Sequence, residues 1–266
     1  MNSPKTETLD QVSAAGRGPL PPRFAVPVID RVVNARPVRV LAVEAQTPTI
    51  VRLQVERPPH FQFRAGQHAL LRVATERGPD LRPLSLAAPP EVDHLEFATR
   101  IGTSAFKQAI IALRPGDLVK VSRPMGGFRY DATRPAVLIA GGIGITPMRS
   151  VLLSAQAAEV TAPTRLLFSN RSIEEIPFLD ELTEHARHRE NLEITWVLTS
   201  PSGAAPTGRV HNGRISEALL QQQAAELPDA VFYVAGPAAM VTDIRALLRQ
   251  VGVARNRTRS VSQGYR

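Results

Sequence analysis

The chain has 266 residues, of which 43% are hydrophobic and 21% charged, and none is cysteine. This length accommodates two ordinary domains, and this composition is typical of a water-soluble globular protein. The absence of thiols excludes disulfides, cysteine-ligated zinc or iron–sulfur centres and thiol catalysis. Any redox chemistry therefore needs an organic cofactor or a metal with other ligands.

The formal net charge of +8, carried mainly by arginine, fits two interpretations. It is typical of a protein that binds an acidic partner or a polyanion, or it reflects arginine enrichment without a binding role. The cations are scattered and aromatic residues make up 5% of the chain, which does not favour nucleic-acid binding. No apolar stretch reaches the roughly 18–20 residues of a membrane span, and Glu7 and Asp10 stand where a secretory signal would be apolar. We expect a cytoplasmic protein without membrane or nucleic-acid partners.

Residues 1–35 are rich in Pro, Gly, Ala and Ser and predict a flexible tail. Between residues 36 and 130, short apolar or alternating runs separated by turns predict strands. These runs are residues 38–43, 50–55, 69–73, 84–87, 95–99 and 118–122, with one of the turns at Arg77-Gly78-Pro79. A single helix, capped by Thr103 or Ser104 and reaching about Leu113, interrupts them. Short strands at this spacing are typical of a six-stranded antiparallel β-barrel.

From residue 131 to residue 266 the pattern changes to strands that alternate with helices. Near-continuous apolar strands are predicted at residues 136–140, 164–168, 192–198 and 230–234. Helices are predicted at residues 147–158, 178–189, 215–225 and 238–251. This alternation predicts a doubly wound parallel sheet, so the barrel is expected to be followed by an α/β domain.

Two short runs point to chemistry. The glycine-rich run from Gly141 to Pro147 follows an apolar strand and leads into a helix. Such a turn lets the pyrophosphate of a dinucleotide approach the backbone and the free N–H groups of a helix N-terminus. In the barrel, Arg82 and Ser85 put a fixed positive charge and a hydroxyl close together, which suits a second phosphate-bearing ligand. Two nucleotide sites predict electron transfer from one cofactor to another.

Five stretches, in this order, resemble the ferredoxin–NADP reductase family of flavoprotein reductases. They are residues 63–67, 82–87, 115–117 with 124–128, 141–147, and 235–237 with Met240. The resemblance extends from about Val38 to Tyr265. It implies that the barrel binds FAD, with FMN left open, and that the α/β domain binds NADPH or NADH. It also implies hydride transfer from NAD(P)H to the flavin and delivery of electrons to a separate acceptor, an acidic redox protein such as ferredoxin, flavodoxin or an oxygenase component. We expect a monomer.

On the flavin side, the resemblance implies that the guanidinium of Arg82 binds the pyrophosphate and that Ser85 hydrogen-bonds flavin N5. Leu84 stands where the family most often has a tyrosine stacked on the flavin ring, and leucine lacks that stacking preference. Tyr265 is a candidate lid on the exposed flavin face, and Ser85 and Tyr265 are the candidate catalytic residues. The second flavin phosphate is expected at the start of the barrel helix, on Gly102, Thr103 and Ser104.

On the dinucleotide side, the loop glycines that permit close backbone approach are Gly141, Gly142 and Gly144. Thr146, followed by Pro147, resembles the residue near the nicotinamide carboxamide. The residues expected beside the nicotinamide are Gly236, Pro237 and Met240. Arg171 follows a strand that has no acidic residue at its end to bind a free ribose 2′-hydroxyl. This favours the 2′-phosphate of NADPH, with NADH left open.

Two alternative functions stay open. Leu84 and the altered C-terminus favour an NAD(P)H:flavin or ferric reductase that binds flavin transiently as a substrate. A protein of another class, a non-catalytic flavin-binding electron-transfer subunit, would bind flavin without reacting with NAD(P)H. No metal site is predicted, because His185 and His188 share a helix face without a third ligand in view.

Overall fold

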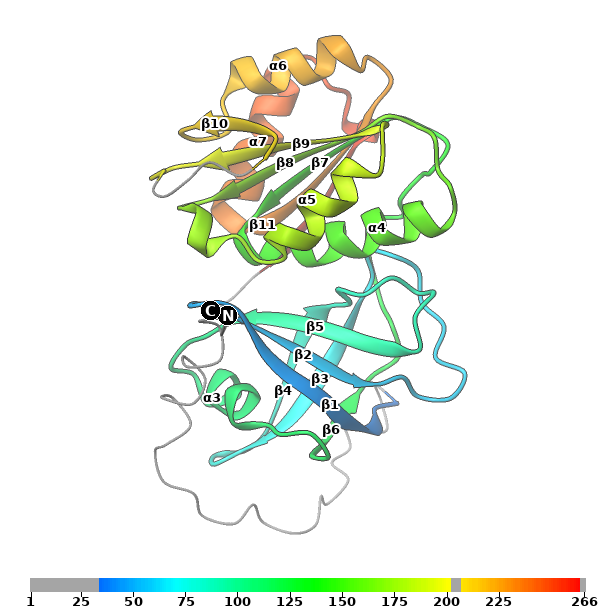
Figure 1. The fold of residues 1–266 in the computed structure, drawn as a ribbon, viewed down its shortest axis with the longest axis vertical. Coiled ribbons are helices and arrows are strands. Elements are labelled where there is room, and N and C mark those ends of the chain that lie inside the picture. The colour runs from blue at the N-terminus through cyan, green and yellow to red at the C-terminus, as the bar shows by residue number, and fades with distance from the viewer. Residues whose placement is uncertain (1–33, 202–206, 264–266) are drawn as a thin grey trace.

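The computed structural model describes residues 34–201 and 207–263, which form two lobes, each built around one sheet (Figure 1). Residues 1–33 of the predicted tail and Tyr265 lie outside the described residues. In the part of the chain that is described, no helix has both the length and the apolar character needed to cross a bilayer.

The first lobe is the predicted antiparallel barrel. Its strands are β1 (Arg36–Thr47), β2 (Ile50–Glu56), β3 (His68–Thr75), β4 (Gly78–Ser85), β5 (His94–Arg100) and β6 (Leu118–Val121). They are ordered β4-β3-β6-β1-β2-β5. Just after β4, the backbone N–H of Ala87 donates to the carbonyl of Glu96 in β5 (2.8 Å), which joins the outer strands and closes the barrel.

The barrel core forms because alternate strand residues are apolar. In β2, Val51, Leu53 and Val55 are buried in the core, whereas the residues between them are only half-buried. The helix α3 (Ala105–Ala112) adds Phe106 and Ile110 to the same core. Its N-cap is Ser104, whose hydroxyl accepts a hydrogen bond from the backbone N–H of Lys107 (3.4 Å), as the sequence predicts.

The second lobe is the predicted parallel sheet. Its strands are β7 (Ala136–Gly141), β8 (Thr164–Asn170), β9 (Leu192–Leu198), β10 (Arg209–Asn212), β11 (Val231–Pro237) and β12 (Thr258–Gln263). They are ordered β10-β9-β8-β7-β11-β12, and every pair is parallel. The helices α4 (Ile145–Ala157) and α5 (Leu179–Arg187) cover one face, and α6 (Glu217–Glu226) and α7 (Ala238–Gln250) cover the other (Figure 1).

Three parts of the sheets differ from the sequence prediction. The strand β4 begins at Gly78, whereas the prediction began it at Leu84 and took Pro79 as part of a turn. Because β4 lies at one end of the strand order, a proline without an N–H group is tolerated there. The strands β10 and β12 were not predicted at all. Both are edge strands composed mostly of polar residues, so neither carries the apolar run of a central strand.

The two lobes share an apolar contact. Ile50 and Ala98 of the barrel belong to the same buried cluster as Met148 of α4. Phe128, in the segment that connects the lobes, packs edge-on against Tyr233 of β11, with ring centroids 5.7 Å apart. The domain boundary that the sequence predicts at residues 130 and 131 falls within this connection between β6 and β7 and stays a prediction.

Candidate active site

The glycine loop follows β7 directly and leads into α4. Residues Gly142–Gly144 form a short 3-10 turn, and α4 begins at Ile145. Gly142 has a φ of +51°, a left-handed conformation that L side chains rarely adopt. The strand, turn and helix expected for a pyrophosphate site are therefore present, with the N-terminus of α4 at the turn.

The carboxyl end of β11 lies against this loop. A Cβ atom on Gly144 would lie 2.6 Å from the carbonyl carbon of Ala235 and 2.7 Å from the backbone nitrogen of Gly236, so a side chain does not fit. A Cβ atom on Gly141 would collide with the sulfur of Met240. The structure thus brings the predicted dinucleotide loop together with the strand end predicted to lie beside the nicotinamide.

The other predicted dinucleotide residues lie around the same edge. Thr146 and Pro147 are buried in the first turn of α4, where the Thr146 hydroxyl donates to the carbonyl of Ile143 (3.0 Å) and braces the loop. Pro237 is exposed at the end of β11. Arg171 is exposed just beyond the end of β8. Because the ends of parallel strands share one edge of the sheet, the Arg171 side chain lies on the same edge as the loop.

The predicted flavin strand is β4. Arg82 is exposed, and its Nη2 donates to Asp80 Oδ2 at 3.0 Å. Exposed pairs of this kind contribute little free energy, so the guanidinium can exchange Asp80 for a phosphate. Ser85 ends the strand opposite His68 of β3. Leu84 is 3% exposed and packs in the barrel core, so it supports the strand from beneath.

The predicted second flavin phosphate site lies between β5 and α3. Thr103 and Ser104 are exposed there, and Gly102 is half-buried. The carbonyl of Gly102 accepts a hydrogen bond from Gln108 Nε2 of α3 (2.6 Å), which holds the turn against the helix. The capping bond of Ser104 occupies the N–H of Lys107, so a phosphate at this turn would meet the N–H groups of Ala105 and Phe106, which precede Lys107 in α3.

Arg100 is a site residue that the sequence interpretation missed. It ends β5, and its Nη2 lies 2.6 Å from where a Cβ atom on Gly142 would stand. The guanidinium from the barrel therefore contacts the glycine loop of the other lobe. Because the side chain is exposed, this cation is accessible to a phosphate bound at the loop.

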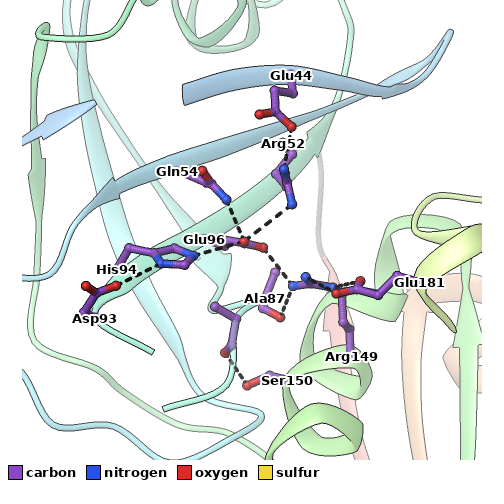
Figure 2. A network of polar contacts seen from close by, with 11 residues as sticks. Glu44, Arg52, Gln54, Ala87, Asp93, His94, Glu96, Arg149, Ser150 and Glu181 are labelled. Carbon is purple, nitrogen blue, oxygen red and sulfur yellow. Dashed lines mark hydrogen bonds and ion pairs between the residues drawn. The ribbon is translucent and has the colours of Figure 1, made fainter. Parts of the chain in front are cut away.

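A buried ion-pair network connects the two lobes (Figure 2). Arg149 of α4 is 4% exposed, and its Nη1 donates to Glu96 Oε2 in β5 and to the carbonyl of Ala87, both at 2.8 Å. Its Nε and Nη2 donate to the carboxylate of Glu181 in α5, at 2.5 and 2.8 Å. One guanidinium therefore binds a carboxylate from each lobe.

The neighbouring serine of α4 makes a second connection. The Ser150 hydroxyl donates to the carbonyl of Ala88 at 2.7 Å. We call Arg149, Ser150, Glu96 and the carbonyl groups of Ala87 and Ala88 the interdomain clamp.

The barrel holds Glu96 ionised. Burial raises the pKa of this carboxyl, but the charge of Arg149, a hydrogen bond from Gln54 and the charge of Arg52 together lower it more. Gln54 Nε2 lies 2.9 Å and His94 Nε2 3.2 Å from Glu96 Oε1. The pKa of Glu96 therefore lies below its usual range, and the clamp keeps its negative charge at neutral pH.

Comparisons with known proteins agree with this arrangement. Residues 138–246 match the model of the oxidoreductase NAD-binding domain family. Over 228 residues the chain is 31% identical to ferredoxin–NADP reductase B from Sorangium cellulosum, which covers 82% of this chain and 93% of that protein. The chain belongs to the ferredoxin–NADP reductase family. It is therefore an oxidoreductase.

Two further comparisons, one with a reductase component and one with a solved structure, are informative. The ferredoxin–NAD(P)+ reductase component of the naphthalene 1,2-dioxygenase system of Pseudomonas putida is 28% identical over 240 residues, covering 86% of this chain and 70% of that protein. A crystal structure of a ferredoxin NADP+ reductase from Neisseria gonorrhoeae with bound FAD and NADP superposes with a TM-score of 0.73 at 23% identity. It covers 86% of this chain and 98% of that one. The two-lobe fold is thus the fold of the family.

Proposed function

We propose that this reductase transfers a hydride from NADPH or NADH to FAD where its two lobes meet and passes the electrons to a separate redox protein. The observation that carries the proposal is the contact between Arg100 and Gly142. The strand that ends in Arg100 continues into Gly102, where the flavin phosphate is expected, while Gly142 lies in the dinucleotide loop. The elements predicted to bind the two nucleotides therefore meet at one place.

The barrel residues fit a flavin nucleotide. Arg82 offers an exposed guanidinium whose bond to Asp80 is exchangeable, and Ser104 exposes a hydroxyl at the N-terminus of α3. These groups would bind the two phosphates, and Ser85, at the end of the same strand as Arg82, would donate a hydrogen bond to the ring. FAD supplies, when bound, an atom that accepts the hydride and a ring that releases electrons singly or in pairs.

The second lobe would bind and orient the dinucleotide. The backbone N–H groups at the start of α4 and the Arg100 guanidinium provide positive charge for its pyrophosphate. Arg171 provides a cation at the end of β8 for the 2′-phosphate of NADPH. Gly236 leaves the end of β11 without a side chain beside the loop. The protein thus contributes positioning and electrostatics, and the hydride chemistry belongs to the cofactors.

The electron acceptor is proposed from the relatives and from charge. Relatives named as ferredoxin reductases and as a reductase component of an oxygenase system pass electrons to separate proteins, and a net charge of +8 suits an acidic partner of that kind. We further propose that the protein acts as a monomer in the cytoplasm.

A second candidate function rests on Leu84. Because this residue is buried in the barrel core, the strand offers no aromatic surface for the flavin ring. Weak flavin retention would make the protein an NAD(P)H:flavin or ferric reductase that uses flavin as a dissociable substrate.

The absorption spectrum of the purified protein, followed by NAD(P)H oxidation with an artificial acceptor, tests both candidates. A bound flavin spectrum and turnover without added flavin support the proposed function. A colourless protein that oxidises NAD(P)H only after FAD or FMN is added supports the second candidate. Bound flavin without any reaction with NADPH or NADH contradicts both and indicates an electron-transfer subunit.

A further inference from the structure

We propose that Arg149 is a positioning residue for hydride transfer: through Glu96 and the carbonyl of Ala87, it fixes the glycine loop relative to the flavin strand. This inference rests on the proposed function and deepens it. Arg149 touches neither nucleotide in this account, so its effect is exerted through the backbone that it connects.

The clamp lies close to both reacting elements along the chain. Ala87 follows Ser85 by two residues, and Arg149 follows Gly144 by five residues along α4. At 1.5 Å per helical residue, the path from Gly144 to Arg149 is about 7.5 Å long. Two residues of extended chain add at most about 7 Å on the barrel side. A bond between Arg149 and Ala87 therefore determines where the loop lies relative to Ser85, with little chain in between to absorb a displacement.

The chemistry of the clamp indicates that it orients the two lobes and is not what holds them together. Ile50, Ala98 and Met148 already hold the lobes together by apolar contact. Replacing a buried ion pair by apolar residues is often neutral or stabilising, so a buried pair is weak evidence for a role in stability alone. A guanidinium donates its hydrogen bonds in one fixed plane. Two donors in that plane meet the barrel, at Glu96 and at the carbonyl of Ala87, and together they permit one relative orientation of the lobes.

Hydride transfer is sensitive to such an orientation. Reacting atoms must approach to about 3–3.5 Å, and a misplacement of about 1 Å can slow a reaction by up to about 100-fold. A residue that determines the relative position of the two nucleotide sites should therefore affect the rate of flavin reduction at saturating dinucleotide more than it affects dinucleotide affinity.

The two carboxylates that share Arg149 provide a matched pair of variants. E96Q and E181Q each remove one negative charge from the same guanidinium and leave an amide oxygen as acceptor. Only Glu96 belongs to the barrel, whereas Glu181 lies in the same lobe as Arg149. If Arg149 acts as a positioning residue, E96Q must impair hydride transfer and E181Q must not.

Two readouts are needed, and one of them does not use the loaded enzyme. In stopped-flow mixing of FAD-loaded protein with NADPH, we expect the limiting rate of flavin reduction to fall about 10-fold in E96Q, with an apparent Kd for NADPH within about twofold of wild type. In the protein without nucleotides, we expect the amides of Leu86, Ala87 and Ala88 to exchange hydrogen about 10-fold faster in E96Q. Both values should stay at the wild-type level in E181Q.

Arg149 variants complete the test. R149M should lower the limiting rate of flavin reduction by up to about 100-fold. R149K keeps the charge but loses the planar donors, so its limiting rate should lie between those of R149M and wild type. Should E96Q fail to fold, R149K is measured with the same two readouts. Equal effects of E96Q and E181Q, or a changed melting temperature with an unchanged limiting rate, would overturn the proposal. If wild-type protein is itself not reduced by NADPH or NADH, the proposed function fails instead, which separates the two outcomes.

Discussion

Gly144→Ala tests the geometry of the glycine loop with the smallest possible change. Gly144 has a φ of −61° and a ψ of −8°, which any residue can adopt. Replacing glycine by alanine at a compatible position normally stabilises a protein by about 0.4–1 kcal/mol. Here the added methyl group meets the backbone of β11, so we expect Gly144→Ala to lower the free energy of unfolding.

The size of the effect follows from the distances. The new Cβ would overlap the carbonyl oxygen of Ala235 and lie 2.6 Å from the carbonyl carbon behind it, whereas ordinary contact begins at 3.4 Å, so the loop must move by at least about 0.8 Å. The obstacle is backbone rather than the end of a flexible side chain. Overpacking of this kind costs about 1–3 kcal/mol. A displacement close to 1 Å also slows a positioned reaction by as much as about 100-fold.

Two measurements follow from this estimate. The free energy of unfolding is obtained from urea titration, using the fluorescence of Trp196, the only tryptophan of the chain and a core residue of the second lobe. The rate of flavin reduction by NADPH is measured on the same preparation. Leu248→Ala is the control, because Leu248 is a fully buried residue of α7, on the other face of the sheet. The free energy of unfolding of Leu248→Ala should be lower by about 2–5 kcal/mol, and the folded variant should reduce flavin at the wild-type rate.

The reasoning is refuted if Gly144→Ala is as stable as wild type, or more stable, and reduces flavin at the same rate. A loss of rate in Leu248→Ala as large as that in Gly144→Ala would show that general destabilisation, not loop position, is responsible.

Three further predictions concern single side chains. Arg82→Ala should weaken FAD binding by about 10- to 150-fold, since a hydrogen bond to a charged group contributes about 1.5–3 kcal/mol, and should leave stability near wild type. Leu84→Ala should mainly lower stability, by about 2–5 kcal/mol. A fluorescence titration with FAD that shows a larger loss of affinity in Leu84→Ala than in Arg82→Ala contradicts the assignment of the strand. Because the folded pKa of Glu96 lies below its usual value, its ionised form stabilises the fold above the unfolded pKa of about 4.3, and this stability disappears as the pH falls through the folded pKa. The difference in unfolding free energy between wild type and Glu96→Gln should therefore be smaller at pH 3 than at pH 7, and a difference that does not change with pH argues against the ionised clamp. Arg171→Ala should raise the KM for NADPH and leave the KM for NADH unchanged; an equal change for both dinucleotides removes Arg171 from the 2′-phosphate site.

Much of the fold follows from local sequence. The central strands β7, β9 and β11 are buried on both faces along most of their length. Their runs are therefore largely apolar, with Glu193 and Thr195 as the polar residues of β9, and their positions were predicted closely. The edge strands β10 and β12 lie against one neighbour only and carry polar residues, and no local pattern distinguishes them from loops. Pro79 misled the interpretation of β4 because a proline signals a turn unless the strand is known to be at an edge.

The arrangement of the candidate site could be predicted in part, for a related reason, while the binding roles of its residues stay predictions. The glycine loop and the strand end at Gly236 carry local signals, and the structure places them in contact. The pairing of Arg149 with Glu96 has no local signal, since the two residues are 53 positions apart. A weaker signal was present in the strand itself: Glu96 stands between the apolar residues Leu95 and Phe97, and a carboxylate inside an apolar strand usually has a buried partner. Only the fold identifies that partner as Arg149.

The central claim is that a nicotinamide dinucleotide bound at the glycine loop delivers hydride directly to a flavin bound on β4. The most direct test is anaerobic mixing of the FAD-loaded protein with NADPH or NADH while the flavin absorbance is followed. The account predicts that the flavin absorbance bleaches at a rate that saturates with dinucleotide concentration and is slower when the transferred hydrogen is deuterium. An oxidised flavin spectrum that persists while dinucleotide binding is saturated would contradict it.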